Sequence, residues 1–508
     1  MPRSRFLIVA LIPFILALFI TYAYFYLSPL PYTWSTSSLD DLYGIATCGN
    51  YVVLGRINVS NMQFWEFTIV DLSNGRVIEV HPPEVMNADG AFIPFPQIGA
   101  GCVNGVLNIV YTCINRSDII NSYVPGICVL RVNGSNGEVL SYGFFSSIYR
   151  NKGTTYALFI GHAAFSSLTL VNNSVYIISM GSVLNSSNTD NVTLTWYLVK
   201  LIISENGSLR LSWETPVALG LGGVYVSRAL GRASPMLGVV DNHVFLLYSG
   251  YGNNGSYNAL LLINDSDGSV IYRENITDIV SDYIYYSAVV NGVLVYPCSG
   301  SSLCGIDLMS GKPRVGFPIN NLGGVVYNVN DYGVVLSQGN HGVNLTVIDN
   351  NGMIIRRIVI PINLYVELGG HCSSLSPMDK GIAILVVSPC SVSYGVYGYK
   401  GLIAIINVTS GSVIHEFIKP VKLPIINSPS PDSILPYIVP VFLVNDRYFF
   451  YFFGGSLYAA SESQLINDSW YYVLFDNAYT VIMLWIITII IMVLTTVMHG
   501  KGREESNN

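Results

Sequence analysis

The sequence predicts an all-β chain, an eight-bladed or alternatively seven-bladed β-propeller, with one transmembrane helix at each end. Three observations lead to this prediction: two long uncharged end runs, a repeated four-strand pattern between them, and an apolar composition. Hydrophobic residues make up 51% of the chain and charged residues 11%, against about 25% charged residues in an ordinary soluble protein. Disordered chains are charged and poor in apolar residues, so disorder is excluded.

The two end runs are long enough to cross a membrane. Phe6–Leu27 and Asn477–Met498 contain no charged residue. A helix of 22 residues is about 33 Å long, and the hydrocarbon core of a bilayer is about 30 Å thick. Two buried core helices would explain such long uninterrupted runs less well. The first run could alternatively be a signal peptide cleaved after its small residues near Ala23.

The flanking charges predict the orientation. Arg3 and Arg5 precede the first run, and Lys501 and Arg503 follow the second. By the positive-inside rule both termini are expected in the cytoplasm. The expected order is a cytoplasmic N-terminus (1–5), a transmembrane helix or signal anchor (6–27), an extracytoplasmic propeller (28–476), a second helix (477–498) and a cytoplasmic tail (499–508).

Sequons and cysteines support export of the central segment. It contains thirteen Asn-x-Ser/Thr sequons, at Asn58, Asn115, Asn133, Asn172, Asn185, Asn191, Asn206, Asn254, Asn264, Asn275, Asn344, Asn407 and Asn467. It also contains all eight cysteines, Cys48, Cys102, Cys113, Cys128, Cys298, Cys304, Cys372 and Cys390. An even cysteine count without a CxxC motif favours disulfides over a thiolate metal site. We therefore expect a cell-surface glycoprotein, of a kind that would suit an archaeal envelope.

A unit of two hairpins repeats along the central segment. The first hairpin of each unit turns at Gly49-Asn50, Asn104-Gly105, Asn172-Asn173, Asp241-Asn242, Asn291-Gly292, Asp331-Tyr332-Gly333, Asp379-Lys380-Gly381 and Asn445-Asp446. The second hairpin turns at Asp/Asn-x-x-x-Gly, clearest at 71–75, 133–137, 264–268, 307–311 and 407–411. Asn-Gly between apolar strands is a strong hairpin signal, because type I′ turns need positive φ at both central residues. Two hairpins make four strands, which is the content of one propeller blade.

The positions of the repeated turns also predict the strands of the last unit and the pairing of the cysteines. The eighth unit, 439–465, shows only three strands, and its fourth is expected at 32–38, closing the ring, or at 470–475. The expected disulfide pairs are Cys48–Cys102, Cys113–Cys128, Cys298–Cys304 and Cys372–Cys390. The long connections between units, which should gather on one face, are 81–100, 143–165, 214–235, 361–377 and 419–440.

The repeat resembles that of the PQQ-like, quinoprotein alcohol dehydrogenase-like propellers. The best matches are the segments 306–312 and 405–411. In the catalytic members of that family, a Trp after the turn glycine docks one blade on the next, and two adjacent cysteines lie beside the quinone. Here only Trp213, after Gly207, suits the docking role, and no two cysteines are adjacent. The resemblance therefore implies a propeller of seven or eight blades and favours the non-catalytic scaffolds.

Few residues are candidates for a site. His162, Arg232 and His371 precede inner strands at matching points and could hold an anionic or sugar-like ligand at the channel mouth. The alternative is that they cap backbone groups of their loops. No cofactor and no metal are predicted, although the resemblance leaves PQQ and calcium open.

The predicted function is a membrane-anchored, non-catalytic binding or scaffold module. Its expected partners are the lipid bilayer and, on the outer face, a protein, glycan or envelope component, because loops on a rigid frame often bind ligands. Net charge is −7 and no basic tract is present, so nucleic acid is not expected. The alternatives are a surface enzyme of the quinoprotein dehydrogenase or glycan-processing type, and an accessory subunit of a membrane complex.

Overall fold

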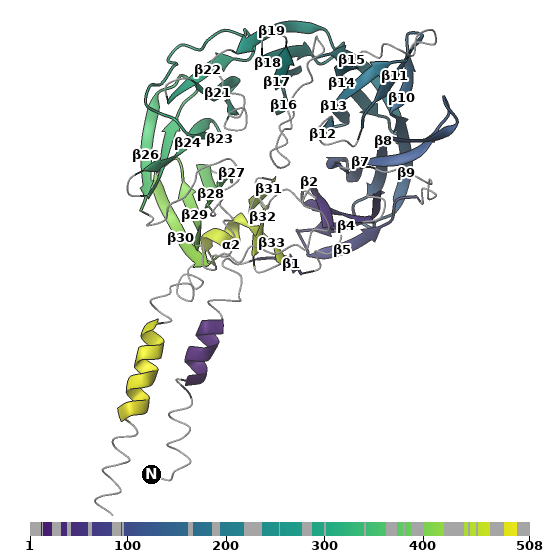
Figure 1. Cartoon of the computed structure of the whole chain (residues 1–508). Helices are drawn as coiled ribbons and strands as arrows, with labels where there is room; N and C mark the ends of the chain where they lie inside the picture. Colours follow the sequence, from purple (N-terminus) through teal and green to yellow (C-terminus); the bar gives the residue numbers. More distant parts are fainter. Residues whose placement is uncertain are drawn as a thin grey trace, which may run out of the picture.

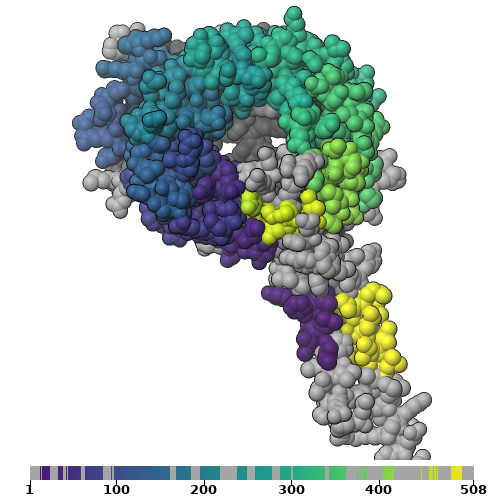
Figure 2. Space-filling model, turned by 180° about the vertical axis from the view of Figure 1, so that it is seen from behind, coloured from purple at the N-terminus to yellow at the C-terminus, as the bar shows by residue number. Residues whose placement is uncertain are grey.

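The chain forms a ring of antiparallel β-sheets, as the computed structural model shows (Figure 1). The structure describes residues 12, 14–22, 32–37, 42–58, 63–83, 93, 96–160, 166–184, 194–217, 236–252, 255–276, 287–298, 301–339, 342–361, 373–378, 381–387, 400–420, 441–445, 448–453, 456–467 and 482–494. Within these residues the strands form eight sheets, most of them four-stranded with the strands paired in chain order. This radial arrangement is a β-propeller, and the space-filling view shows it hollowed at its centre (Figure 2).

The strands of the first half of the ring form four sheets. The first sheet contains β2 (Leu42–Cys48), β3 (Tyr51–Asn58), β4 (Gln63–Asp71) and β5 (Arg76–Val80), and the second contains β6 (Ile98–Val103), β7 (Val106–Ser117), β8 (Ser122–Asn133) and β9 (Val139–Ser146). The third contains β10 (Ile148–Asn151), β11 (Thr154–Leu158), β12 (Ser166–Val171), β13 (Ser174–Val183), β14 (Leu194–Ile203) and β15 (Leu209–Pro216). The fourth contains β16 (Met236–Val240), β17 (His243–Gly252), β18 (Gly255–Asn264) and β19 (Val270–Ile276).

The second half of the ring contains the other four sheets. The fifth contains β20 (Ala288–Val290), β21 (Val293–Cys298) and β22 (Ser302–Asp307), and the sixth contains β23 (Val325–Val329), β24 (Tyr332–Gly339), β25 (Gly342–Ile348) and β26 (Ile354–Ile360). The seventh contains β27 (Ser373–Pro377), β28 (Ile382–Val387), β29 (Lys400–Asn407) and β30 (Ser412–Pro420). The last contains β31 (Val441–Asn445), β32 (Tyr448–Phe453), β33 (Ser456–Ser461) and β1 (Trp34–Thr36), with the short helix α2 (Glu462–Asn467) following β33.

The first-hairpin turns have the predicted chemistry. Asn104 and Gly105 have φ angles of 52° and 79°, and Asn291 and Gly292 have 45° and 75°. Both central residues are thus left-handed, as a type I′ turn requires. One predicted turn is shifted: Asn330, with φ of 54°, precedes Asp331, and β24 already begins at Tyr332. Asparagine tolerates the left-handed conformation, so the turn forms one residue before the predicted position.

Two units depart from the predicted four strands. The fifth sheet has three strands within the described residues. Its expected fourth strand does not form, because the segment after Gly311 contains Pro313 and Pro318, which cannot donate ladder hydrogen bonds. That segment is held by isolated bridges instead, such as Leu303 with Ile319. The third sheet gains the hairpin β10–β11, which lies inside the predicted long connection 143–165.

The ring closes through the N-terminal strand. Residues of β1 pair antiparallel with β33, with Trp34 opposite Ala459 and Thr36 opposite Leu457. This confirms the first of the two predicted sources of the last strand. Since β1 begins beside the end of β33, the chain enters and leaves the ring at adjacent points.

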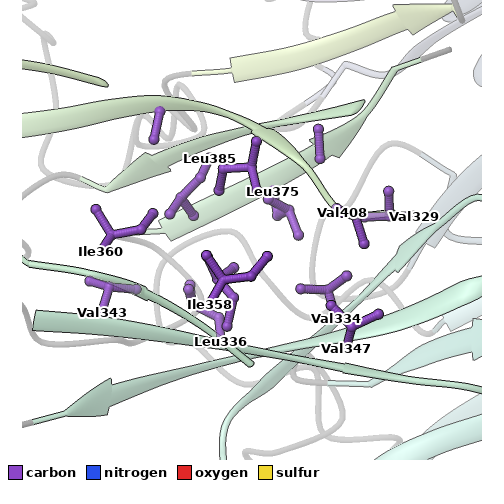
Figure 3. Packing of buried hydrophobic residues seen from close by; sticks show 14 residues of the cluster. Val329, Val334, Leu336, Val343, Val347, Ile358, Ile360, Leu375, Leu385 and Val408 are labelled. Atoms are coloured by element: carbon purple, nitrogen blue, oxygen red, sulfur yellow. The ribbon is translucent and has the colours of Figure 1, made fainter. Parts of the chain in front are cut away.

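Apolar side chains fill the space between neighbouring sheets. Figure 3 shows one such layer, where Val343 and Ile360 from the sixth sheet face Leu385 from the seventh. All three are nearly inaccessible to solvent. When both faces of a strand are packed, nearly all of its residues are apolar, which explains the lack of apolar–polar alternation in the sequence.

A tryptophan docks the third sheet on the fourth, as the resemblance implies. Trp213 on β15 donates its Nε1–H to the carbonyl of Asp265 at 2.8 Å and lies against Gly268 in the next turn. A Cβ added at Gly268 would lie 2.7 Å from the indole ring. The turn glycine is therefore needed for this close approach as well as for its φ of 75°.

Other residue types make the same contact elsewhere in the ring. Tyr272 donates its hydroxyl to the carbonyl of Leu308 at 2.6 Å and lies against Gly311. Arg356 donates to the carbonyl of Ser410 and contacts the following turn glycine, Gly411. Blade docking thus uses side chains of the strand that follows a turn glycine, and not tryptophan alone.

Two helical segments lie side by side below the ring in both views (Figures 1 and 2). They comprise residues 14–22 and 482–494, inside the two predicted runs. Trp485 donates its Nε1–H to the Thr21 hydroxyl at 2.8 Å, and the ring of Phe14 meets the Trp485 ring edge-on at 5.8 Å. Among the residues that the structure describes, no helix combines the length and apolarity needed to cross a bilayer.

The blades have two distinct ends. Both hairpin turns of each unit lie at one end, here named the tight-turn side, and the connections between units lie at the other, the long-connection side. The start of β1 and the end of β33 lie on the tight-turn side, because Ser461 pairs with Tyr448 directly after the first-hairpin turn. Both chain ends therefore leave the propeller on the tight-turn side.

Candidate functional site

The residues predicted to bind a ligand lie outside the described part of the chain. These are His162, Arg232 and His371. The predicted pair Cys372–Cys390 also lies outside it. The suggested ligand site at the channel mouth therefore stays a prediction.

Three of the four predicted disulfides are confirmed. Cys48 bonds Cys102, joining the inner strands of the first two sheets. Cys113 bonds Cys128 across β7 and β8, and Cys298 bonds Cys304 across β21 and β22.

Several sequon asparagines have a structural role in turns. Asn58, Asn172, Asn206 and Asn275 are exposed, and Asn115, Asn133, Asn264, Asn344 and Asn407 are half-buried. The Oδ1 of Asn133 accepts hydrogen bonds from the backbone N–H and the hydroxyl of Ser135, at 2.9 and 2.7 Å. Asn206 and Asn264 bond the serine two residues on in the same way. Asp71 occupies this position in the first unit and bonds Ser73 likewise. The turn alone accounts for a short polar residue at these positions, so a sequon there is weaker evidence for a glycan.

Within the described residues, a cluster of tyrosines around a carboxylate lies on the long-connection side at the inserted hairpin β10–β11. We name Tyr149, Tyr156, Tyr197 and Glu214 the tyrosine cluster. Tyr149 and Tyr156 face each other across the hairpin, while Tyr197 and Glu214 come from β14 and β15 of the same sheet. Lys152 and Gly153, with φ of 47° and 83°, form the turn that brings the two strands together.

The cluster is a stack of rings around one carboxylate. The rings of Tyr149 and Tyr156 are stacked at 5.3 Å with an interplanar angle of 13°, and Tyr197 meets Tyr156 edge-on at 5.7 Å. Tyr149, which is 6% exposed, donates its hydroxyl to Oε2 of Glu214. Tyr156 and Glu214 are half-buried, so the cluster reaches the surface.

The phenols of the cluster are held in the protonated form. Burial, and then the hydrogen bond to Glu214, raises the pKa of Tyr149 well above its usual value of 10.0. The same two causes raise the pKa of Tyr156 to about 12. Near neutral pH both hydroxyls are therefore donors to the carboxylate and not phenolate nucleophiles. This arrangement suits recognition of a polar ligand, with ring surface and fixed hydrogen-bonding groups, better than proton transfer.

Sequence reasoning missed this cluster, because no motif joins its members. The available signal was the turn-forming pair Lys152-Gly153 between two short segments with β-branched and aromatic residues, 148–151 and 154–158, within a segment predicted to be a long connection. Among the described residues, no group of three or more His, Cys, Asp or Glu side chains could hold a metal ion.

Comparison with known proteins finds similarity in solved structures only. No protein-family model and no curated protein matches the chain. BamB from Moraxella catarrhalis is 11% identical, with a TM-score of 0.41 over 85% of this chain and 99% of that one. The computationally designed Ika8 protein is 10% identical, with a TM-score of 0.42 over 85% and 98%. A europium-containing methanol dehydrogenase is 11% identical, with a TM-score of 0.42 over 84% and 85%.

Proposed function

We propose that this chain is a membrane-anchored, extracytoplasmic propeller of eight blades that acts as a non-catalytic binding or scaffold module. Its partner would be a protein, glycan or envelope component held on the long-connection side. The observation that carries this proposal is the opposite placement of two features. The chain ends leave on the tight-turn side, whereas the tyrosine cluster lies at the long-connection end of its sheet.

The helix contact supports anchoring. Ile20 packs against Leu484 and Trp485, and the bond from Trp485 to Thr21 joins the two predicted membrane runs. Interhelical hydrogen bonds of this kind stabilise helix pairs in lipid, where water does not compete. A chain anchored twice beside one blade would hold its tight-turn side near the bilayer.

The blade count is supported by the sheets in the described residues. They number eight, and the last one is completed by β1. Each sheet would be one blade, with the fifth short of its outer strand. Glycans on the exposed sequons, such as Asn58 and Asn275, would be consistent with a cell-surface location, including an archaeal envelope.

Photo-crosslinking in intact membranes tests the proposed function. A photo-reactive amino acid would replace Tyr156 on the long-connection side, and Val77, 48% exposed at the start of β5 on the tight-turn side, would be the matched control. We expect a discrete crosslinked partner from position 156 and none from position 77. Crosslinks from neither position, or digestion of the propeller only by protease supplied from the cytoplasmic side, would contradict the proposal.

A further inference from the structure

The hairpin β7–β8 ends in an exposed apolar tip on the long-connection side. Its two strands, of 12 residues each, are paired from Val106–Asn133 out to Ser117–Ser122. Beyond the last pair lie Ile119 and Ile120, which are 37% and 46% exposed. Tyr123, just inside β8, is 38% exposed. Adjacent large apolar side chains at a loop tip are typical of contact sites and not of an ordinary solvated turn.

The tip is held rigidly in place. The disulfide Cys113–Cys128 crosses the hairpin, and Asn121, with φ of 55°, closes the tip by donating its N–H to the carbonyl of Ser117 at 2.8 Å. Arg116 also donates to Oδ1 of Asn121. A preorganised tip loses little conformational entropy when it binds.

The hairpin β7–β8 adjoins the hairpin β10–β11 a few residues inside its tip. Ser147, which is 3% exposed, donates its N–H to the carbonyl of Pro125 at 3.1 Å and accepts from Leu158 at 2.9 Å. At about 3.3 Å per residue, Tyr123 is about 7 Å from this junction and Arg150 about 10 Å. One partner surface of ordinary size, about 800 Å² on each side, covers both hairpins.

The exposed charged residues of the two hairpins are mostly cationic. Arg116, Arg150 and Lys152 are exposed, and Asp118 is the exposed carboxylate at the tip. Glu214, the carboxylate of the tyrosine cluster, is half-buried and bonded to Tyr149. This local excess of positive charge stands out in a chain with 24 basic and 31 acidic residues. Complementary charge then favours an acidic partner.

We propose that Ile119, Ile120 and Tyr123, flanked by Arg150 and Lys152, form a docking surface for an acidic protein segment that carries aliphatic side chains. We name these five residues the tip surface. The inference rests on the proposed binding function and adds the chemistry of the partner. Aliphatic side chains would pack on the two isoleucines, while carboxylates would pair with the flanking cations.

The test uses the full-length protein in lipid nanodiscs and three probes. The probes are a soluble peptide that alternates Glu with Leu, its Lys–Leu counterpart, and vesicles of anionic phospholipid. We expect the Glu–Leu peptide to bind at least about tenfold more tightly than the Lys–Leu peptide, with an affinity that falls as salt is added.

Two variants locate the binding. Ile119→Ser/Ile120→Ser and Arg150→Glu/Lys152→Glu are each expected to weaken binding of the Glu–Leu peptide about tenfold or more. The matched controls lie on the tight-turn side and should leave binding unchanged. They are Val139→Ser/Leu140→Ser, at residues 44% and 46% exposed, and Arg210→Glu/Lys312→Glu, at exposed residues. Circular dichroism and an intact Cys113–Cys128 disulfide would show that each variant is folded.

The remaining outcomes would overturn the proposal. These are equal affinity for both peptides, binding that the tip variants do not alter, and binding of the vesicles but not of the peptides. Self-association that is lost in the tip variants would also overturn it, in favour of a second copy of the chain. A crosslinked partner at position 156 together with failure of the peptide test would leave the general binding function standing and reject only this surface.

Discussion

At the scale of single residues, the junction of the third and fourth sheets contains a buried ion pair. Lys200, 7% exposed, bonds Oδ2 of Asp265 at 2.7 Å, and Tyr176 donates its hydroxyl to Oδ1 at 2.6 Å. Leu72, Leu308 and Val408 hold the position of Asp265 in other units, since each donates its N–H to the carbonyl of a first-hairpin turn. An ion pair thus replaces an apolar contact at one junction.

We predict that Asp265→Ala lowers the free energy of unfolding by about 3–5 kcal/mol, because it leaves Lys200 buried and unpaired. The double variant Lys200→Met/Asp265→Leu restores the apolar contact of the other units but removes the acceptor of the buried Tyr176 hydroxyl, so it should be only about 1–3 kcal/mol less stable than the wild type. Denaturant titration measures both values. Arg314→Ala, which breaks a half-exposed pair with Asp307, is the control and should cost less than about 1 kcal/mol. A double variant as unstable as Asp265→Ala would contradict this reasoning.

The tyrosine cluster gives a prediction for alkaline pH. An unfolded tyrosine ionises near its usual pKa of 10.0, whereas the pKa of folded Tyr156 is about 12 and that of Tyr149 is raised further. The stabilisation is therefore fully present below pH 10 and is lost as the pH rises toward 12 and beyond. Tyr149→Phe should make unfolding less sensitive to alkali, as measured by thermal melts at increasing pH. Tyr123→Phe, at an exposed tyrosine outside the cluster, is the control for the substitution itself.

At the scale of elements, Trp213 docks the third sheet on the fourth. We predict that Trp213→Ala costs about 3–5 kcal/mol through the cavity that it leaves. Trp213→Phe keeps most of the packing and loses the bond to the Asp265 carbonyl, so it should cost about 1–3 kcal/mol. Trp65→Ala, at a residue 43% exposed, is the control and should change stability little. Equal effects of the two Trp213 variants would show that packing contributes little at this junction.

The elements also show how far the sequence predicts the structure. Turn residues such as Asn104-Gly105 identify hairpins, because only a few residue types adopt positive φ. The positions of the cysteines relative to these predicted hairpins gave the Cys48–Cys102 disulfide correctly. The sequence predicted blade docking only at Trp213, because only tryptophan was expected in that role. Tyr272 and Arg356 make the same contact with a phenol and a guanidinium group. The tyrosine cluster depends on side-chain placement from four strands, β10, β11, β14 and β15, which local sequence does not specify.

At the scale of the whole molecule, one strand from the start of the chain completes the last sheet. β1 covers the edge of β33, and Trp34 packs in a cluster with Leu457 and Ala459, both fully buried. Without β1, β33 would expose both its backbone edge and this apolar layer. Ring closure is therefore expected to stabilise all blades together and not only the last one.

Two truncations separate closure from anchoring. A chain that lacks residues 1–27 keeps β1, whereas one that lacks residues 1–36 loses it, and neither has the first predicted membrane run. We predict that the shorter truncation unfolds cooperatively in detergent at nearly the full-length midpoint. The longer one should unfold at a lower temperature and aggregate, because an open ring exposes a sheet edge. Thermal melts and light scattering measure these properties, and equal midpoints for the two truncations would mean that β1 adds nothing to the closed ring.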